Sequence, residues 1–432
     1  MYIAFDDTDS TNFMCTTFLA TEIIRALPQY DLIGFPRLVR LNPSVPWKTR
    51  GNGALCLRLG HGAGQSSIIG EIEGREIKSY SRSKGAPDRD EVLELCHQLL
   101  TKWSRTQEDA SPGMVVSERQ PSQRLYWRTV REIVRKEEVL EELHRVGASF
   151  FELAGGRGII GASAAMSWRP RDRTYEILAY RTRERWGSPR EVRPEDVALL
   201  DSLFPSTFNN YDSVAQRPVI VPHSPCPILF GIRGDDPSVL PIAMRSIRGE
   251  AIDRWLIFIT NQGTDDHIIR KWSELRPWSS YCVQGKVSKA PRTIAGGHVI
   301  LGLSTKVGEV ECAAYEPSKE FREVVRKLIA GDEVVVMGEL RENPRTLNLE
   351  KLCVTELARD WRKVSNPICP QCSKSMKSMG VSGWYRCKRC GQKSKGGEKR
   401  EEMTRDLVPG WYEPPVRARR HLSMPLKRQL LP

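Results

Sequence analysis

The chain begins with YIAFDDTDS, residues 2–10, in which a mostly apolar run precedes three carboxylates. We expect a buried strand that ends at Asp6, Asp7 and Asp9, followed by an amphipathic helix over residues 16–27. Carboxylates bind hard cations such as Mg²⁺, and helix N-termini and hydroxyl groups bind phosphate oxygens. This turn therefore indicates either a site for Mg²⁺ and a nucleoside triphosphate or an acidic turn that only caps the helix.

Length and composition limit the class of protein. A chain of 432 residues is too long for one core, so we expect three or four domains. Its net charge of +13 points to a polyanionic partner, usually nucleic acid, although a generally basic surface is the alternative. We find no apolar run long enough to span a membrane and no signal-peptide layout at the N-terminus. Seven of the eleven cysteines are scattered singly, which favours a reducing cytoplasm.

The first 275 residues alternate between strand and helix patterns. Strands are predicted near 2–5, 32–41, 53–59, 114–116, 159–167, 174–180 and 255–260. Helices are predicted near 16–27, 66–71 and 88–103, with a longer periodic helix over 122–145. The pattern is typical of α/β and α+β units.

The region 281–357 has a different texture, with short β-rich runs separated by glycine turns. Five strands are predicted within VQGKVSKAPR, HVILGLST, GEVECAAY, DEVVVMGEL and LNLEKLCVTEL. A helix over 318–330 lies between the third and fourth strands. This is the order of an OB-fold β-barrel, a common binder of single-stranded nucleic acid. Another small barrel without a ligand on its face is the alternative.

Two CxxC pairs, separated by fourteen residues, follow the barrel region. They supply four thiols, Cys369, Cys372, Cys387 and Cys390. This spacing predicts a closed, structural Zn²⁺ site, against the lesser alternatives of a redox pair or coincidence.

Basic residues surround these cysteines. Together with Trp384 and Tyr385, which could stack on bases, they suit RNA contact. A solvated basic ribbon that packs on a neighbouring domain is the other interpretation. After Cys390 the chain is rich in Lys, Arg and Pro, and we expect it to be partly disordered.

Three further motifs are ambiguous when each is taken alone. KTRGNG at 48–53 is either a phosphate-binding turn or a plain hairpin turn. GGRGIIG at 155–161 is either a phosphate nest or a tight loop, and no strand–helix unit is predicted around it that would make it a dinucleotide motif. TNQGTDDH at 260–267 follows an apolar strand, and its carboxylates could receive a cationic ligand or cap a following helix.

Read in order, these motifs resemble the TiaS family, the archaeal tRNA(Ile) 2-agmatinylcytidine synthetases. The resemblance covers nearly the whole chain and is carried by DDTDS, MCTTFLA, GFPRLVRLNP, KTRGNGA, GRGIIGA, ILAYR, PSTFNN, PCPILFGIRG and TNQGTDDH. It implies a kinase-like ATP-binding domain (1–145), a ferredoxin-like domain (146–275), an OB-fold (276–360), and a zinc ribbon with a basic tail (361–432).

The resemblance also implies an activity. Such an enzyme is an ATP-dependent ligase that replaces the 2-oxo group of the wobble cytidine of isoleucine tRNA (CAU anticodon) with agmatine. The products are 2-agmatinylcytidine, AMP and phosphate, and the modified tRNA reads the codon AUA. The resemblance implies ATP, Mg²⁺ and structural Zn²⁺ as cofactors, and tRNA and agmatine as partners.

The family motifs also assign roles to residues of this chain. Asp6, Asp7 and Asp9 fall on the acidic motif that holds Mg²⁺ and ATP. Thr16 falls on the autophosphorylated threonine, with Thr17 as the adjacent alternative. The resemblance implies ATP binding for Thr8, Lys48, Arg50 and Asn52. Arg157, Arg233, Asp265 and His267 also fall on matched motifs, and we assign them to substrate binding. The chain departs from the family pattern at Asn12-Phe13 and at Asp235-Asp236.

Two other functions compete with this interpretation. A metal-dependent phosphoesterase would also place aspartates at a strand end, but the chain has no DHH-type motif. A non-catalytic RNA-binding protein built from the barrel and the ribbon would leave the N-terminal motifs unexplained.

Overall fold

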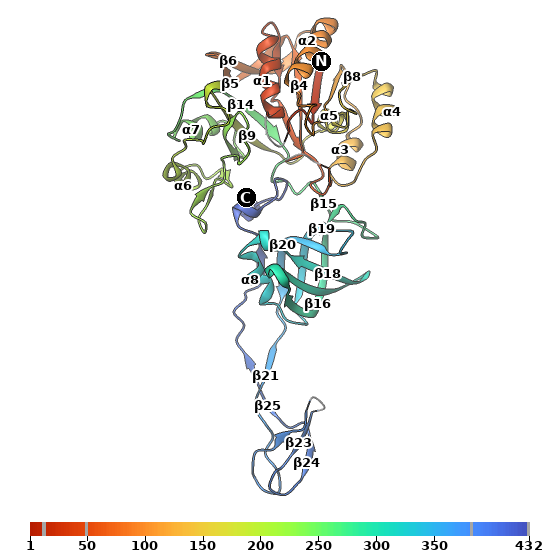
Figure 1. Ribbon diagram of the computed structural model, residues 1–432, viewed down its shortest axis with the longest axis vertical. Coiled ribbons are helices and arrows are strands. Elements are labelled where there is room, and N and C mark those ends of the chain that lie inside the picture. The colour runs from red at the N-terminus through yellow and green to blue at the C-terminus, as the bar shows by residue number, and fades with distance from the viewer. Residues whose placement is uncertain (11–13, 48–50, 381–382, 430–432) are drawn as a thin grey trace.

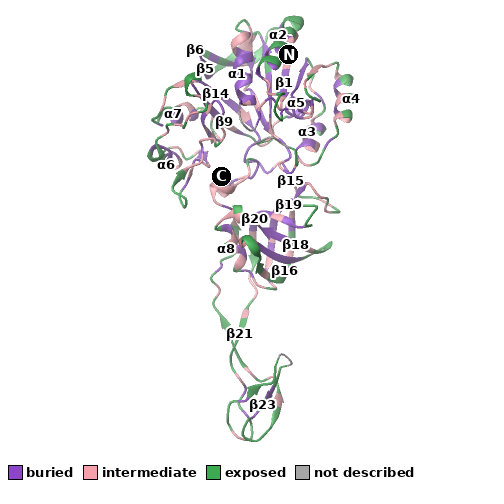
Figure 2. Ribbon diagram, in the orientation of Figure 1, coloured by how far each residue is buried: buried purple, intermediate pink, exposed green. Residues whose placement is uncertain are grey.

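The computed structural model describes residues 1–10, 14–47, 51–380 and 383–429. These residues form an elongated molecule with three parts (Figure 1): a large α/β body, a β-barrel, and a small ribbon at the end of a two-stranded stalk. Buried residues concentrate in the body and the barrel, whereas the stalk and ribbon are mostly exposed (Figure 2). The predicted multidomain architecture is confirmed.

One twelve-stranded sheet forms the centre of the body. Strand β1 (Tyr2–Asp6) lies between β4 (Gly53–Gly60) and β7 (Gly113–Ser117) and is antiparallel to both. Successive side chains of a strand point to opposite faces, so Ile3 reaches one hydrophobic core and Ala4 reaches another. The apolar N-terminal residues therefore form a strand that is buried on both faces.

Helices cover both faces of the sheet. Helices α1 (Thr16–Ala26) and α2 (Arg89–Trp103) contribute to the first core. Helices α3 (Gln123–Thr129), α4 (Lys136–Val146) and α5 (Gly158–Ser167) contribute to the second. Helix α5 packs directly against β1, β4 and β7, and this brings its N-terminus to the carboxyl end of β1.

The sheet continues without a break into the second half of the body. Strand β14 (Ile252–Thr260) pairs with β9 (Thr174–Arg181) and with β5 (Gly62–Ile72), and runs parallel to β3 (Arg37–Arg40). Strand β13 (Ile228–Gly234) extends the sheet beyond β9. The two halves of the body therefore share one sheet. The other elements are β2 (Asp31–Ile33), β6 (Arg75–Ser83), β8 (Ser149–Glu152), a 3₁₀ turn (Arg183–Arg185), α6 (Pro194–Leu203), β10 (Thr207–Phe208), β11 (Tyr211–Asp212), β12 (Arg217–Pro218) and α7 (Leu240–Arg245).

The helix predicted over 66–71 is wrong, because these residues belong to the β5–β6 hairpin. The two-residue turn of this hairpin is Glu73-Gly74, with φ angles of 51° and 73°. Positive φ at both central residues matches the twist of a hairpin and explains the glycine. The strand predicted over 32–41 is interrupted after β2 by Gly34, whose φ is 75°.

Two further predictions for the body are wrong. The single helix over 122–145 is two helices, α3 and α4, and the connection between them buries Val130 and Val134 in the core. The strand predicted over 159–167 is helix α5, so GGRGIIG does connect a strand, β8, to a helix. A helix that is buried on all sides has a continuous apolar sequence without helical periodicity. A buried strand has the same kind of sequence, so the two cannot be told apart by periodicity.

The five strands and the helix predicted over 281–357 all form. They are β16 (Ser279–Thr293), β17 (Val299–Thr305), β18 (Gly308–Ala314), α8 (Phe321–Arg326), β19 (Glu333–Leu340) and β20 (Leu347–Glu356). Neighbouring strands follow the order β16-β17-β18-β20-β19, and pairing of β16 with β19 closes the barrel. Two 3₁₀ turns (Ala295–Gly297 and Glu316–Ser318) lie between strands, and β15 (Ile268–Ile269) adds a short edge.

The stalk pairs β21 (Asp360–Ser365) with β25 (Lys399–Met403). Beyond it, the ribbon contains β22 (Lys377–Ser378), β23 (Trp384–Arg386) and β24 (Lys393–Lys395). Trp384 is 41% exposed and can stack on a base, but Tyr385 is buried in the ribbon core. The predicted stacking role is therefore wrong for Tyr385.

The expected disorder after Cys390 is not found in the described residues of the tail. The chain leaves the ribbon through β25, adds β26 (Gly410–Tyr412) to the barrel, and forms a 3₁₀ turn (Val416–Ala418) and helix α9 (Leu426–Gln429). The tail ends between the body and the barrel, where the C mark lies in Figure 1. Its arginines are held by carboxylates of both parts, which the sequence pattern did not indicate. Among the described residues, no helix has the length and apolar character needed to cross a membrane.

Candidate functional site

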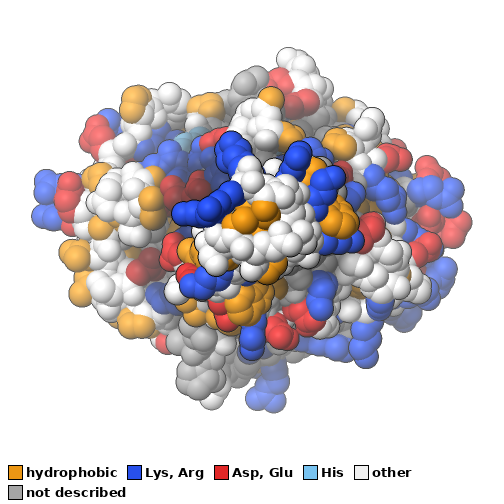
Figure 3. Space-filling view, turned by 90° about the horizontal axis from the view of Figure 1, so that it is seen from below, with side chains coloured by type: hydrophobic (Ala, Val, Ile, Leu, Met, Phe, Trp, Pro, Cys, Tyr) orange, Lys and Arg blue, Asp and Glu red, His pale blue; other side chains and the backbone are white. Residues whose placement is uncertain are grey.

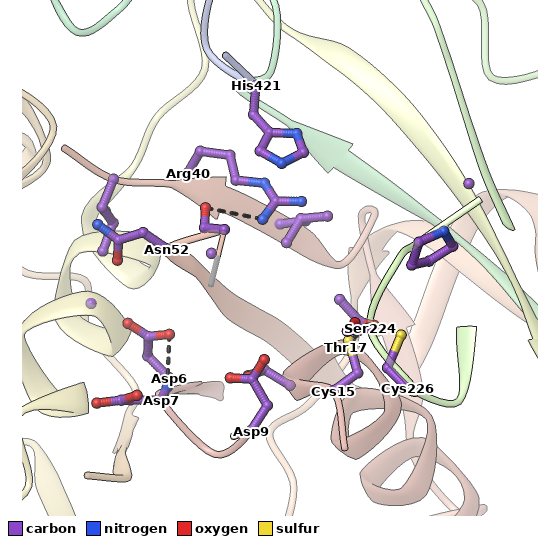
Figure 4. A pocket seen from close by; sticks show the side chains of 18 of the residues that line it. Asp6, Asp7, Asp9, Cys15, Thr17, Arg40, Asn52, Ser224, Cys226 and His421 are labelled. Carbon is purple, nitrogen blue, oxygen red and sulfur yellow. Dashed lines mark hydrogen bonds between the residues drawn. The ribbon is translucent and has the colours of Figure 1, made fainter. Parts of the chain in front are cut away.

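A pocket of about 450 Å³ opens in the body at the carboxyl end of β1. Its wall combines segments that are far apart in the sequence: the turn after β1, the start of α1, the end of β3, the N-terminus of α5, the loop before β13, and the C-terminal tail. Figure 4 shows carboxylates on one side of this pocket and Arg40 and His421 on the other. The pocket thus joins both halves of the body.

The carboxylates of Asp6, Asp7 and Asp9, which the sequence analysis singled out, line one side of the pocket. Burial raises the pKa of Asp6 well above its usual range, and the neighbouring charges of Asp7 and Asp9 add to this effect. Burial also raises the pKa of Asp7, although an ion pair of 2.9 Å with Arg157 opposes the rise. The main-chain N–H of Asp7 donates to Asp6 Oδ1 at 2.8 Å. This concentration of negative charge favours a bound cation.

Two glycines explain why α5 can approach the carboxylates so closely. A Cβ atom at Gly158 would collide with the main-chain carbonyl of Asp6, and one at Gly161 would collide with Asp6 Oδ2. The GRGIIG motif therefore places a helix N-terminus directly against the end of β1. Because helix N-termini carry partial positive charge, α5 favours anionic groups at this place.

The hydroxyl groups of Thr8 and Thr16 lie beside the same carboxylates. Thr8 Oγ1 donates to Thr16 Oγ1 at 3.2 Å, and Thr16 Oγ1 donates to Asp9 Oδ1 at 3.2 Å. Thr16 is the first residue of α1, and Thr17 also lines the pocket, 3.0 Å from the sulfur of Cys15. The threonine assigned to phosphorylation thus contacts the acidic cluster.

Arg40 and Asn52 lie away from the carboxylates in Figure 4, and Gly51 also lines the pocket. Arg40 Nη1 donates to the carbonyl of Gly51 at 3.2 Å, and burial lowers the pKa of this guanidinium. Asn261 forms hydrogen bonds of 2.7 and 2.8 Å with the main chain of Arg40, which fixes the end of β3. Asn52 Nδ2 donates to the carbonyl of Asn42 at 2.9 Å. Lys48 and Arg50 lie outside the described residues.

Part of the pocket wall is largely apolar. This part is formed by Leu178, Ile228 and the 219–222 segment. Glu176 faces this part from within β9, and it accepts hydrogen bonds from Arg233 at 3.0 Å and Gln262 at 2.6 Å. A buried carboxylate beside apolar walls suits a ligand with methylene groups and a cationic end.

The predicted substrate residues divide into two sets. Arg157 and Arg233 line the pocket, each paired with a carboxylate. Asp265 and His267 do not line it. Asp265 pairs with Lys351 of the barrel at 2.6 Å, and His267 Nε2 lies 2.9 Å from Glu350 of the barrel.

The sequence patterns did not indicate three residues of the pocket: Arg40, Glu176 and His421. One signal was available for Glu176, because a lone carboxylate within the apolar strand TYEILAY requires a buried partner. His421 belongs to a tail that was expected to be partly disordered.

The four ribbon thiols come together as predicted, with their sulfur atoms within 4.8 Å of one another. Cys369 Sγ is 3.5 Å from Cys390 Sγ, close to the separation of about 3.8 Å that tetrahedral zinc thiolates require. Main-chain hydrogen bonds close both CxxC turns, from Ser373 to Cys369 and from Gly391 to Cys387. The donor set fits a structural Zn²⁺ held by four thiolates.

Family models match most of the chain. The TiaS TCKD domain matches residues 2–155, the TiaS FLD domain matches 156–267, and the TiaS C-terminal zinc ribbon domain matches 366–407. Among curated proteins, the tRNA 2-agmatinylcytidine synthetase TiaS of Methanocaldococcus jannaschii is 39% identical over 440 residues, which is 99% of this chain and 98% of the relative.

Solved structures agree with these matches. The crystal structure of TiaS in complex with its isoleucine tRNA and ATP superposes with a TM-score of 0.86 at 37% identity, covering 100% of this chain and 97% of that one. The complex of TiaS with the same tRNA, AMPCPP and agmatine superposes with a TM-score of 0.83 at 34% identity and the same coverage. The predicted family is therefore confirmed, and the chain belongs to the TiaS family.

Proposed function

We propose that this protein is an ATP-dependent ligase that joins agmatine to carbon 2 of the wobble cytidine of CAU-anticodon isoleucine tRNA, with release of AMP and phosphate. The observation that carries the proposal is the composite pocket. It places an acidic cluster and threonine hydroxyls beside a largely apolar part of the pocket that contains Glu176. One cavity can therefore hold a polyphosphate and a long dication next to each other. Family membership supports the same activity.

The chemistry needs an activated oxygen, because the 2-oxo group of cytosine is a poor leaving group. To give AMP, ATP must lose its β- and γ-phosphoryl groups: one is transferred to the 2-oxygen, and the other ends on water as phosphate. The primary amine of agmatine can then attack carbon 2 and lose a proton, while the 2-oxygen leaves with its phosphoryl group as a second phosphate. The carboxylates of Asp6, Asp7 and Asp9 would hold Mg²⁺, which would neutralise phosphate charge. Thr16 would accept a phosphoryl group, since its hydroxyl contacts Asp9.

The other site residues have roles that follow from their positions. Asn52 lines the pocket, where it can bind the phosphates of ATP. Thr8 is buried and donates to Thr16, and we assign Thr8, Lys48 and Arg50 to ATP binding from the motifs alone. Arg157 and Arg233 are paired with Asp7 and Glu176, so they orient carboxylates of the pocket.

Agmatine would occupy the apolar part of the pocket, which is lined by Leu178, Ile228 and residues 219–222. Its methylene chain suits Leu178 and Ile228, and its guanidinium would share the carboxylate of Glu176 with Arg233. Asp265 and His267 would serve the junction of body and barrel through Lys351 and Glu350, in place of the substrate role assigned from the motif.

We assign the barrel to the OB class, because its strand order β16-β17-β18-β20-β19, with a helix before β19, is the order of that fold. The kinase-like and ferredoxin-like descriptions, with the boundaries 1–145 and 146–275, remain assignments for the two halves of the body. The barrel and the basic ribbon would bind tRNA, with exposed Trp384 available for stacking.

Analysis of the adenine products tests this proposal. With Mg²⁺, agmatine and CAU-anticodon isoleucine tRNA, labelled ATP should give AMP, and omission of either agmatine or tRNA should reduce AMP formation strongly. AMP formed by a metal-dependent phosphoesterase would not depend on tRNA or agmatine, and an ordinary kinase would give ADP alone.

A further inference from the structure

Residues 413–429 cross from the barrel to the body, and we call them the C-terminal strap. Arg417 Nη1 lies 2.8 Å from Asp212 of the body, while its Nη2 lies 2.7 Å from Glu320 of the barrel. At the end of the strap, Arg428 pairs with Asp172 at 2.6 Å and with Asp235 at 2.7 Å. These ion pairs attach the strap to both the body and the barrel.

Figure 3 shows the molecule from the ribbon end, and Lys and Arg side chains are spread over much of this face.

The middle of the strap is fixed more firmly than its ends. Leu422 is 2% exposed and belongs to the core of the body that contains α5. The main-chain N–H groups of Gly263 and Asp265 donate to the carbonyls of His421 and Leu422, at 2.8 and 2.9 Å. Asp265 Oδ1 accepts from the main-chain N–H of Met424 at 2.8 Å. Strap residues 421–424 therefore have a set backbone position.

This anchoring directs the side chain of His421 into the pocket. Figure 4 shows its imidazole next to Arg40, on the wall that faces the carboxylates of Asp6, Asp7 and Asp9. His421 Nε2 lies 3.5 Å from the place where a Cβ atom of Gly51 would be. An imidazole N–H beside a guanidinium forms a donor pair suited to phosphate oxygens or to the ring nitrogens of a purine.

We propose that His421 contacts the bound nucleotide, and that the C-terminal strap supplies this contact to a pocket whose other lining residues, apart from Arg417 of the same strap, belong to the body. The inference rests on the proposed function only in that the pocket takes ATP. Arg420, the preceding residue, pairs with Glu339 and, at 3.1 Å, with Glu350 of the barrel. The barrel therefore helps to position His421 through the ion pairs of the neighbouring Arg420.

Three variants test the inference in the full-length protein. His421→Ala removes the donor, His421→Gln keeps an N–H group at a similar reach, and His97→Ala is a matched control on the exposed face of α2, outside the pocket. We expect His421→Ala to weaken ATP binding about tenfold, as loss of a hydrogen bond to a charged group does. His421→Gln should restore most of the affinity, and His97→Ala should match the wild type.

The measurements are the ATP dissociation constant without tRNA, the KM for ATP and kcat of AMP formation, and tRNA affinity as a test of folding. Unchanged ATP affinity in His421→Ala would overturn the inference. Equal loss in His421→Ala and His421→Gln would also overturn it, because the imidazole would then act through packing alone. If the wild type binds ATP but forms no AMP, while His421→Ala still weakens ATP binding, the proposed function fails and the assignment of His421 holds.

Discussion

At the scale of single residues, the acidic cluster opposes folding while it prepares the site for a cation. Asp6 and Asp7 lie next to each other and are partly buried, and Arg157 is the cation paired with Asp7 at 2.9 Å. Their pKa values are raised, because charge that is removed from water and placed beside like charge is unfavourable. Such unfavourable clustering of carboxylates is expected at a site where the metal ion of a bound metal–polyphosphate complex supplies the missing positive charge.

Asp7→Asn removes one charge without changing the volume of the side chain. We expect kcat for AMP formation to fall by at least about a hundredfold, since a metal-holding carboxylate supplies several kcal/mol of transition-state stabilisation. Asp90→Asn, an exposed substitution in α2, is the control and should leave the rate unchanged. Steady-state kinetics across a Mg²⁺ series would measure both, and near-normal activity of Asp7→Asn would remove Asp7 from the site.

The raised pKa of Asp6 predicts a pH dependence of stability. The folded state holds a proton on Asp6 more tightly than the unfolded state does. The protein should therefore lose stability as the pH rises from the usual aspartate range through the raised pKa. Asp6→Asn can still accept the hydrogen bond from the N–H of Asp7, so in EDTA its Tm should exceed that of the wild type at pH 8.

This difference should shrink as the pH is lowered, and Mg²⁺ with ATP should raise the Tm of the wild type alone. Thermal unfolding at a series of pH values would check these expectations. Equal Tm values for the two proteins at every pH would contradict the stated origin of the pKa shift.

Among the helices and strands, local sequence patterns correctly predicted those elements whose period and turn residues are visible in the sequence. The strand–helix order of β1 and α1, helix α2 and the five barrel strands all follow from period and turn residues. Helix α5 could not be recognised, because burial on all sides removes its amphipathic period. The pocket shows the same limit: Asp6 and Asp9 were found through DDTDS and Thr16 through MCTTFLA, whereas Arg40 and Glu176 reach the pocket only through the pairing of distant strands.

Gly161→Ala tests the close contact between α5 and β1. The added Cβ would collide with Asp6 Oδ2, so we expect both activity and stability to fall, by roughly 1–3 kcal/mol in the free energy of unfolding. Ser163→Ala is a matched control in the same helix. Its buried hydroxyl has no hydrogen-bond partner among the described residues, so its loss should be neutral or stabilising. Urea unfolding would measure both variants, and a Gly161→Ala protein as stable as the wild type would contradict the packing argument.

At the scale of the whole molecule, the chain passes through its parts and then returns. It runs from the body through the barrel to the ribbon, and the C-terminal strap comes back to the pocket. Truncation after Asn366 would therefore remove His421 together with the ribbon, and its effects could not be assigned to either. An internal deletion separates the two.

Replacing residues 366–398 with a short turn keeps β21 paired with β25 and leaves the strap in place. This deletion removes seven Lys and Arg residues as well as Trp384. We expect weaker tRNA binding and unchanged ATP affinity. The salt dependence of tRNA binding should also become shallower, by about 0.9 in slope for each phosphate that the protein no longer neutralises. Filter binding across a salt series would measure the slope. An unchanged slope and affinity for tRNA would mean that the ribbon does not contact the RNA.

Mass spectrometry of the wobble nucleoside tests the proposed agmatine-transfer activity most directly. CAU-anticodon isoleucine tRNA is incubated with the protein, ATP, Mg²⁺ and agmatine, digested, and compared with a reaction that contains Asp7→Asn. We expect 2-agmatinylcytidine at the wobble position with the wild-type protein and unmodified cytidine with the variant. Unmodified cytidine in the wild-type reaction, or equal product from Asp7→Asn, would contradict it.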